Sequence, residues 1–211
     1  MRWVPLALLL ATASAQAQDV DVEPYWQARR AGAVGIVAGR VFAEPRTPTA
    51  SPKAIPGTTV TLLPRSAALL TQLERLKQRA RDSSTAFAAA APAMRKAMEV
   101  YERELLQAGA PDLTPLVLVD SDGVFRIEDV PAGSWLLLAW HSTPVDLSTS
   151  KTKAKERGLY QPRPRVQGFQ SVTVWLRELS VSGGATVTEK LTDRSVWFQG
   201  VAEDKVLDTG R

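Results

Sequence analysis

The sequence predicts a mainly β protein, an antiparallel β-sandwich interrupted by an inserted α-helical hairpin. Three observations predict this fold. The stretch from Val119 to Trp140 reads as two strands, the turn between them and the start of a third strand. Residues 66–108 contain no glycine and carry apolar side chains at helical spacing. Strand-like alternation then returns and continues almost to the end of the chain.

Residues 1–17 predict an export signal. A positive start at Arg2 precedes an apolar run to Ala11, and small residues at Ala13, Ala15 and Ala17 suit a signal peptidase. The run is about half the length needed to span a bilayer, so no stable membrane anchor is expected. The chain has no cysteine, and therefore neither a disulfide nor a lipid attachment point. We expect a periplasmic or secreted protein after cleavage of this signal peptide.

A polar N-terminal arm over residues 18–32 leads into the sandwich, which we predict over residues 33–200. The first strand covers 33–43, where Gly35 and Gly39 indicate a bulge or a close backbone approach. After a proline-rich loop, residues 57–63 resume strand character, with Val60 and Leu62 on one face.

The helical insert is predicted over residues 65–110. Two apolar series have helical spacing: Leu69, Leu73, Leu76 and Ala80, then Met94, Ala97, Met98, Tyr101 and Leu105. Helix-capping residues near 83 and a proline at 92 both allow a break, so the sequence leaves two positions open for the turn, near residue 83 or near residue 91.

Strand patterns dominate after the insert. Asp122-Gly123, between 116–119 and 124–127, predicts a β-hairpin. A strand over 134–140 and a polar loop over 142–167 follow, before a strand over 169–181. Gly183-Gly184 predicts a turn after which residues 186–191 pair back, residues 195–198 make a last short strand, and residues 201–211 are expected to form a flexible tail.

The order of these features resembles the carboxypeptidase regulatory-like domain, an Ig-like, prealbumin-like (transthyretin-like) β-sandwich family. The resemblance covers most of residues 33–191 and departs from the family in the helical insert and the long basic loop. It rests on the segments Gly35–Val41, Ile55–Leu62, Asp120–Phe125, Val130–Leu137 and Gln170–Leu176. The resemblance implies a binding or stability module without catalytic residues.

Nothing in the sequence forms a catalytic or metal-binding constellation. His141 is the single histidine, and without cysteines it has no companions for a nitrogen or sulfur metal site. Asp120 and Asp122 resemble the start of a calcium loop, but the later ligands are missing and a turn accounts for both. We therefore expect no enzyme activity and no cofactor.

The charge balance excludes a typical nucleic-acid binder. The chain has 26 basic and 22 acidic residues, and loss of Arg2 lowers the net charge from +4 to +3. The candidate basic loop has few aromatic residues for base stacking. We expect a solvated loop, with a docking site for an anionic surface as the alternative. Its basic residues are Lys151, Lys153, Lys155, Arg157, Arg163 and Arg165.

Tryptophans form the candidate interaction patch: Trp140, Trp175 and Trp197. If Trp135 faces the sandwich core, alternation sends Trp140 to the other face, and we assign Trp175 to that outer face as well. One hypothesis is that the helical hairpin covers this face. The other is that the tryptophans form an exposed patch for a ligand or partner.

The resulting expectation is a non-catalytic accessory or interaction module of the bacterial cell envelope. Its partner would be another envelope protein or a polysaccharide. The alternative is a carbohydrate-binding module that stacks sugars on its exposed tryptophans.

Overall fold

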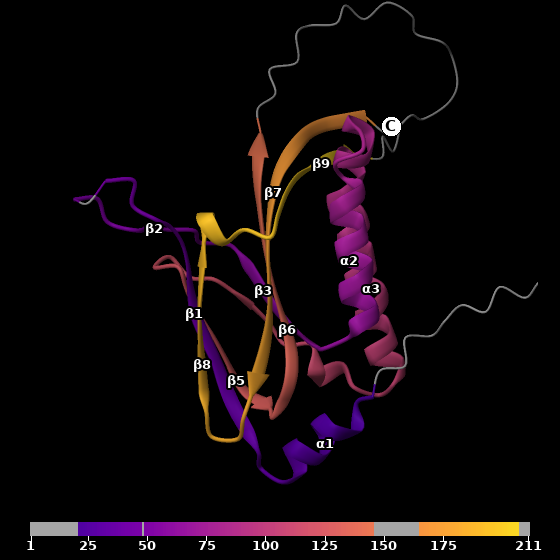
Figure 1. The fold of residues 1–211 in the computed structure, drawn as a ribbon, viewed down its shortest axis with the longest axis vertical. Helices are drawn as coiled ribbons and strands as arrows, with labels where there is room; N and C mark the ends of the chain where they lie inside the picture. The colour runs from indigo at the N-terminus through magenta and orange to yellow at the C-terminus, as the bar shows by residue number, and fades with distance from the viewer. Residues whose placement is uncertain (1–20, 48, 146–164, 207–211) are drawn as a thin grey trace, which may run out of the picture.

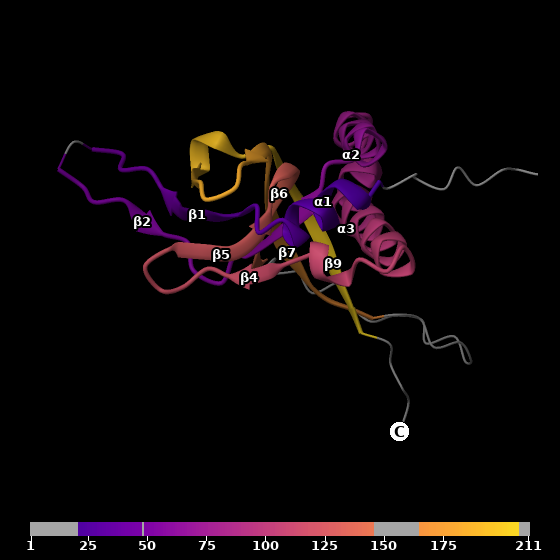
Figure 2. The same cartoon turned by 90° about the horizontal axis from the view of Figure 1, so that it is seen from below.

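The computed structural model describes residues 21–47, 49–145 and 165–206. The predicted signal peptide lies outside these residues, as do Lys151, Lys153, Lys155, Arg157 and Arg163 of the basic loop. Two β-sheets and a pair of helices make three successive layers (Figures 1 and 2). The predicted β-sandwich with an inserted helical hairpin is confirmed.

The described residues form nine strands in two sheets, which we call sheet A and sheet B. Sheet A consists of β1 (Val34–Ala43), β2 (Lys53–Ala54), β5 (Val124–Pro131) and β8 (Thr186–Thr192). Sheet B has the order β4-β3-β6-β7-β9, namely Leu116–Leu118, Thr59–Pro64, Gly133–Val145, Arg165–Val181 and Phe198–Val206. Strand β1 pairs antiparallel with β5 and parallel with β8.

The predicted β-hairpin at Asp122-Gly123 is wrong in its pairing, although the turn is present. The Gly123 N–H donates to the Asp120 carbonyl at 3.1 Å, and Gly123 has a φ of +79°. However, β4 pairs with β3 in sheet B, whereas β5 pairs with β1 in sheet A. The turn therefore carries the chain from one sheet to the other. A turn signal is local, whereas the strand partner depends on where both sheets lie.

The predicted pairing of residues 186–191 back onto the preceding strand is also wrong. After the turn at Gly184, β8 enters sheet A and runs parallel to β1. Gly39 allows this close approach, because a Cβ there would lie 2.3 Å from the Glu189 carbonyl oxygen. The predicted bulge in β1 is confirmed by a register shift between Gly35 and Val37.

The space between the sheets holds the first hydrophobic core. Sheet A contributes Val37, Val41, Phe125 and Ile127, and sheet B contributes Val60, Leu62, Trp135, Leu137, Ala139 and Trp175. Alternation along β6 places Leu136 and Leu138 on the opposite face.

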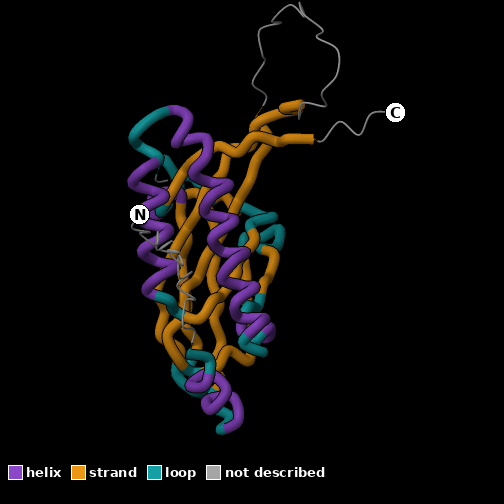
Figure 3. The backbone as a smooth tube through the Cα atoms, turned by 90° about the vertical axis from the view of Figure 1, so that its right-hand side faces the viewer, coloured by secondary structure: helices purple, strands orange, loops and turns teal. Residues whose placement is uncertain are grey.

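The helical hairpin packs on that opposite face of sheet B (Figure 3). Helix α2 covers Ala67–Arg79 and α3 covers Ser84–Gln107. The turn lies at the earlier of the two predicted positions, where the Ser83 hydroxyl accepts the Ala86 N–H at 3.0 Å, and Pro92 lies inside α3. The second core buries Leu69 and Leu73 of α2 and Met94, Tyr101 and Leu105 of α3 against Leu136, Leu138, Val172, Val174 and Phe198. The hypothesis that the hairpin packs on the outer face of this sheet is confirmed, although the hairpin covers only part of that face.

The N-terminal arm contains helix α1 (Glu23–Arg30), which closes one end of the sandwich. The Tyr25 ring meets Trp135 edge-on at 4.9 Å, and its hydroxyl donates to the Ser134 carbonyl oxygen at 2.5 Å. Two single-turn 3-10 helices, η1 (Pro111–Leu113) and η2 (Asp193–Ser195), complete the described elements.

The predicted flexible tail is wrong over residues 201–206, and residues 207–211 lie outside the described residues. Residues 201–206 belong to β9, which pairs antiparallel with β7 as far as Arg165 opposite Val206. Pairing with β7 orders these residues through backbone hydrogen bonds, which the amino-acid composition of the segment did not predict. None of the helices in the described residues is both long and apolar enough to cross a bilayer.

Candidate functional site

Trp175 is not part of any surface patch. Only 1% of its surface is exposed, and its indole N–H donates to the Thr192 carbonyl at 2.7 Å. Trp175 lies opposite Ala139, so it shares the inter-sheet face of β6. The assignment of Trp175 to the outer face is therefore wrong. Val172, Val174 and Leu176 face the helices, and the alternating pattern by itself did not say which face was inner.

Trp197 is half-buried between sheet B and helix α2. Its indole N–H donates to Glu74 Oε1 at 2.7 Å. Lys77 Nζ lies 4.7 Å from the centre of its ring, a cation–π distance. These contacts hold α2 beside the sheet.

Trp140 borders an open groove beside helix α3. Its indole N–H donates to Ser142 Oγ at 3.0 Å, and the Arg95 guanidinium lies 4.6 Å from the ring centre. The three tryptophans thus occupy three different environments and do not make one stacking platform.

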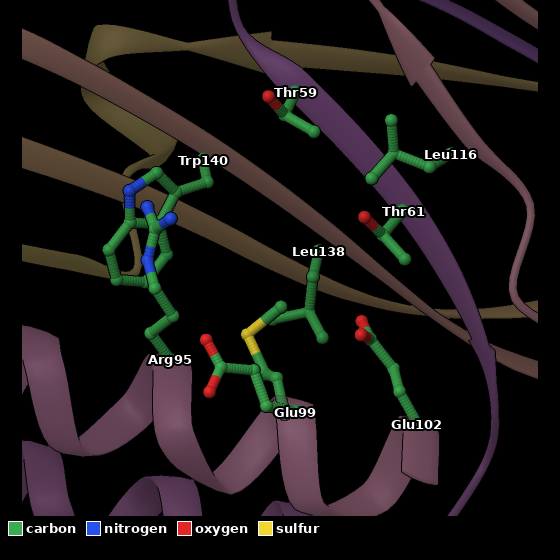
Figure 4. Close-up of a pocket in the computed structure, with 9 residues that line it drawn as sticks. Thr59, Thr61, Arg95, Glu99, Glu102, Leu116, Leu138 and Trp140 are labelled. Atoms are coloured by element: carbon green, nitrogen blue, oxygen red, sulfur yellow. The ribbon is translucent and has the colours of Figure 1, made fainter.

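A groove opens between helix α3 and the strands β4, β3 and β6. We call it the α3 groove, and its volume is about 200 Å³. Figure 4 shows Arg95, Glu99 and Glu102 rising from α3 toward the strands. The residues that line it are Thr59, Thr61, Arg95, Met98, Glu99, Glu102, Leu116, Leu138 and Trp140.

Strand register explains why the groove is open. Leu118, Thr59, Trp140, Val174 and Phe198 form one row across the five strands of sheet B. Val174 and Phe198 are 2% and 6% exposed, whereas Leu118 is 66% exposed. The helices therefore cover the β7 and β9 side of this face and leave the β4 side open.

Two carboxylates give the groove its charge. Within the described residues, neither Glu99 nor Glu102 forms an ion pair. Burial, reinforced by the nearby Glu99, raises the pKa of Glu102. The neighbouring cation, Arg95, stacks on Trp140. The groove is thus a partly apolar trough with an acidic wall.

Replacing Glu102 by glutamine is expected to stabilise the protein at neutral and alkaline pH. The raised pKa means that the folded state binds the Glu102 proton more tightly than the unfolded state, so wild-type stability falls as pH rises through that pKa. The charged groups on this wall are Glu99 and Arg95, and the facing strands contribute the uncharged Thr59 and Thr61. Thermal unfolding at several pH values measures the effect, which should disappear below the ordinary glutamate pKa.

The matched control is Glu128→Gln, because Glu128 is exposed and its carboxylate pairs with Arg126 at 2.7 Å. This variant should gain no stability at neutral pH. Equal melting temperatures of the Glu102→Gln variant and the wild type across the pH range would contradict the raised pKa of Glu102.

The remaining polar candidates have structural partners. His141 Nδ1 lies 3.3 Å from the Thr58 hydroxyl, and burial lowers the pKa of His141. The Asp120 carboxylate accepts the N–H groups of Asp122 and Val124 at 3.0 and 2.7 Å. It therefore organises the turn, as the sequence predicted. No group of three or more His, Asp or Glu side chains suited to a metal ion occurs in the described part of the chain.

Arg95, Glu99, Glu102 and the two threonines of β3 were not singled out in the sequence. The signal was present as polar side chains spaced four and three residues apart on one side of α3, beside Met98. Such spacing is equally typical of any solvated helix face. Only the packing of α3 on sheet B turns it into the wall of a groove.

Comparison with known proteins assigns the chain to no family. No protein-family model and no curated protein matches the chain. One solved structure with a similar chain trace is that of a proposed carbohydrate-binding protein from Pseudomonas aeruginosa, with 13% identity, a TM-score of 0.43, and coverage of 76% of this chain and 88% of that one. Another is the pilus backbone protein of Streptococcus pneumoniae, with 12% identity, a TM-score of 0.22, and coverage of 50% and 30%.

The class of protein is defined by the fold. It is a two-sheet β-sandwich in which a helical hairpin covers one outer face incompletely.

Proposed function

We propose that the protein is a non-catalytic, exported binding module of the bacterial cell envelope and that its partner occupies the α3 groove. The observation that carries this proposal is the incomplete cover of sheet B. The hairpin buries Val174 and Phe198 but leaves Leu118 and Leu116 of the same face exposed. An open apolar rim beside a polar wall is typical of an interaction site.

Export and the absence of catalysis are part of the same proposal. Residues 1–17 have the pattern of a cleavable signal, and the lack of cysteine suits a domain held together by its core. The groove places Glu99 and Glu102 beside threonines and leucines, without a nucleophile paired to a base. The resemblance to the carboxypeptidase regulatory-like family, whose members are binding or stability modules, is consistent with this role.

Photocrosslinking tests whether the α3 groove is the interface. A benzoylphenylalanine at Glu99, which is exposed in the groove, should give a discrete adduct in bacterial cells that express the full chain. The matched control is the same photoprobe at Lys190, which is exposed on β8 in sheet A. Absence of an adduct from Glu99, or an identical adduct from Lys190, would overturn the proposal.

A carbohydrate partner is the second candidate, and Trp140 is the observation that favours it. Its half-buried ring borders the groove together with the Thr59 hydroxyl and two carboxylates, and sugars combine apolar faces with hydroxyl groups. Trp175 and Trp197 do not belong to this site, because Trp175 is buried between the sheets and Trp197 lies beside helix α2, away from the groove.

Tryptophan fluorescence separates the two candidates. Titration with purified envelope polysaccharides should give saturable quenching that is lost in Trp140→Phe if a sugar binds. A protein partner predicts no saturable change in this titration, together with a Glu99 photoadduct of protein mass.

A further inference from the structure

Strand β4 is an open edge of sheet B. Within the described residues it pairs only with β3, and β3 is bordered on its other side by β6. The Pro115 carbonyl accepts the Leu62 N–H. The Val119 N–H donates to the Thr58 carbonyl, and the Val119 carbonyl accepts the Gly57 N–H. Backbone groups alternate in direction along a strand, so those of Leu116 and Leu118 point away from β3 toward the open edge.

The side chains on this edge are apolar and exposed. Leu116 and Leu118 are 61% and 66% exposed and stand on the face that carries the α3 groove. Proteins normally protect open edges with charged residues, because an apolar edge invites another strand to pair.

Two other sheet edges in the described part of the chain have that protection. Strand β5 carries exposed Arg126 and Glu128, and β8 carries exposed Lys190. The three residues of β4 are Leu, Val and Leu. The lack of charge on β4 therefore distinguishes this edge from β5 and β8.

The chemistry of a partner strand follows from the wall beside β4. Glu99 and Glu102 lie on α3 across from Leu116 and form no ion pair within the described residues. The repulsion between them and the partial burial of Glu102 are relieved by a cation placed between them. A lysine or arginine can lay its aliphatic stem on the leucines and extend its charge to these carboxylates.

We propose that the β4 edge binds an extended, cationic peptide segment, which adds as a sixth strand to sheet B and places alternate Lys or Arg side chains toward Glu99 and Glu102. This inference rests on the proposed function and specifies the class of partner. Strand addition supplies affinity through the backbone of Leu116 and Leu118, and the carboxylates supply selectivity for positive charge.

A designed probe tests the inference directly. The probe is an acetylated, amidated and fluorescently labelled heptapeptide, Thr-Lys-Val-Lys-Val-Lys-Thr, whose lysines share one face of a strand. Fluorescence anisotropy with the mature chain should show saturable binding. The same peptide with Glu in place of Lys should not bind. Neither should one with Pro in place of both the middle Lys and the second Val, because neighbouring residues turn their N–H groups to opposite sides of a strand, so one of the two must face the edge, and proline lacks this N–H.

Protein variants locate the binding. Leu118→Lys should weaken binding at least tenfold, because it adds a like charge to the edge, and the exposure of Leu118 leaves folding intact. The double variant Glu99→Gln and Glu102→Gln should weaken it several-fold. The matched control, Thr188→Lys on the exposed edge of β8, should bind as the wild type does. In hydrogen exchange, bound peptide should protect the amides of Leu116 and Leu118.

Absence of saturable binding, or binding that Leu118→Lys leaves unchanged, would overturn the inference. So would concentration-dependent dimerisation abolished by Leu118→Lys, because a second copy of the chain would then be the occupant. If the Glu99 photoadduct persists while the heptapeptide does not bind, the partner is of another class and the proposed function stands. If the photoadduct is absent, the proposed function itself fails.

Discussion

Replacing Trp175 by alanine is expected to destabilise the protein by about 3–5 kcal/mol, the usual cost of removing a large aromatic side chain from a core. Trp175 is 1% exposed and packs between the two sheets, and the substitution also leaves the Thr192 carbonyl without its 2.7 Å hydrogen bond. Urea unfolding followed by far-UV circular dichroism measures the change in the free energy of unfolding.

Trp140→Ala is the matched comparison. Trp140 is half-buried at the groove, so its loss should cost only about 1 kcal/mol while changing the surface where we place the partner. If Trp175→Ala were as stable as the wild type and had lost ligand binding alone, Trp175 would belong to a binding surface and the sandwich packing described above would be wrong.

Placing a charge at Leu73 is expected to detach the helical hairpin from sheet B. Leu73 is 1% exposed in the second core, and an aspartate there has no cationic partner among the residues of that core. An uncompensated buried charge costs about 3–5 kcal/mol, so Leu73→Asp should lower the free energy of unfolding by that amount. Release of the hairpin would also expose Leu136 and Leu138, which binding of a hydrophobic dye would report.

Gln72→Asp provides the control, because Gln72 is the adjacent, exposed residue of α2. It introduces the same charge on the same helix turn and should change stability by less than about 0.5 kcal/mol. Hydrogen exchange along β6 adds a second readout. Unchanged protection of Leu136 and Leu138 in Leu73→Asp would show that the hairpin does not stabilise the sheet.

The helical insert was predictable because its signals are local. The apolar spacing from Leu69 to Leu105 defines two amphipathic helices, and Ser83 provides a cap within the sequence itself. Pro92 was an equally reasonable breaking point, since proline fits a first helical turn. In the structure, helix α3 continues through Pro92. Ala90, Ala91 and Met94, on both sides of this proline, are buried against sheet B.

The candidate site was less predictable because it depends on which face of each strand is inner. Val172, Val174 and Leu176 share one face whichever side the core lies on, so alternation could not decide between Trp175 and its neighbours. Trp175 is buried because its register in sheet B places it opposite Ala139, on the face between the two sheets. In the same way, Arg95, Glu99 and Glu102 look like ordinary solvated residues until α3 is placed beside β3 and β4.

By itself, the sequence determined the fold class, the positions of most strands and the existence of a helical hairpin, because periodicity, caps and turn residues act over a few neighbours. Only the tertiary structure decided that Asp122-Gly123 joins two sheets, that β8 runs parallel to β1, and that the hairpin stops short of β4. These features depend on contacts between segments far apart in the chain. The α3 groove and its apolar edge arise from them, so the site could not be read from any single segment.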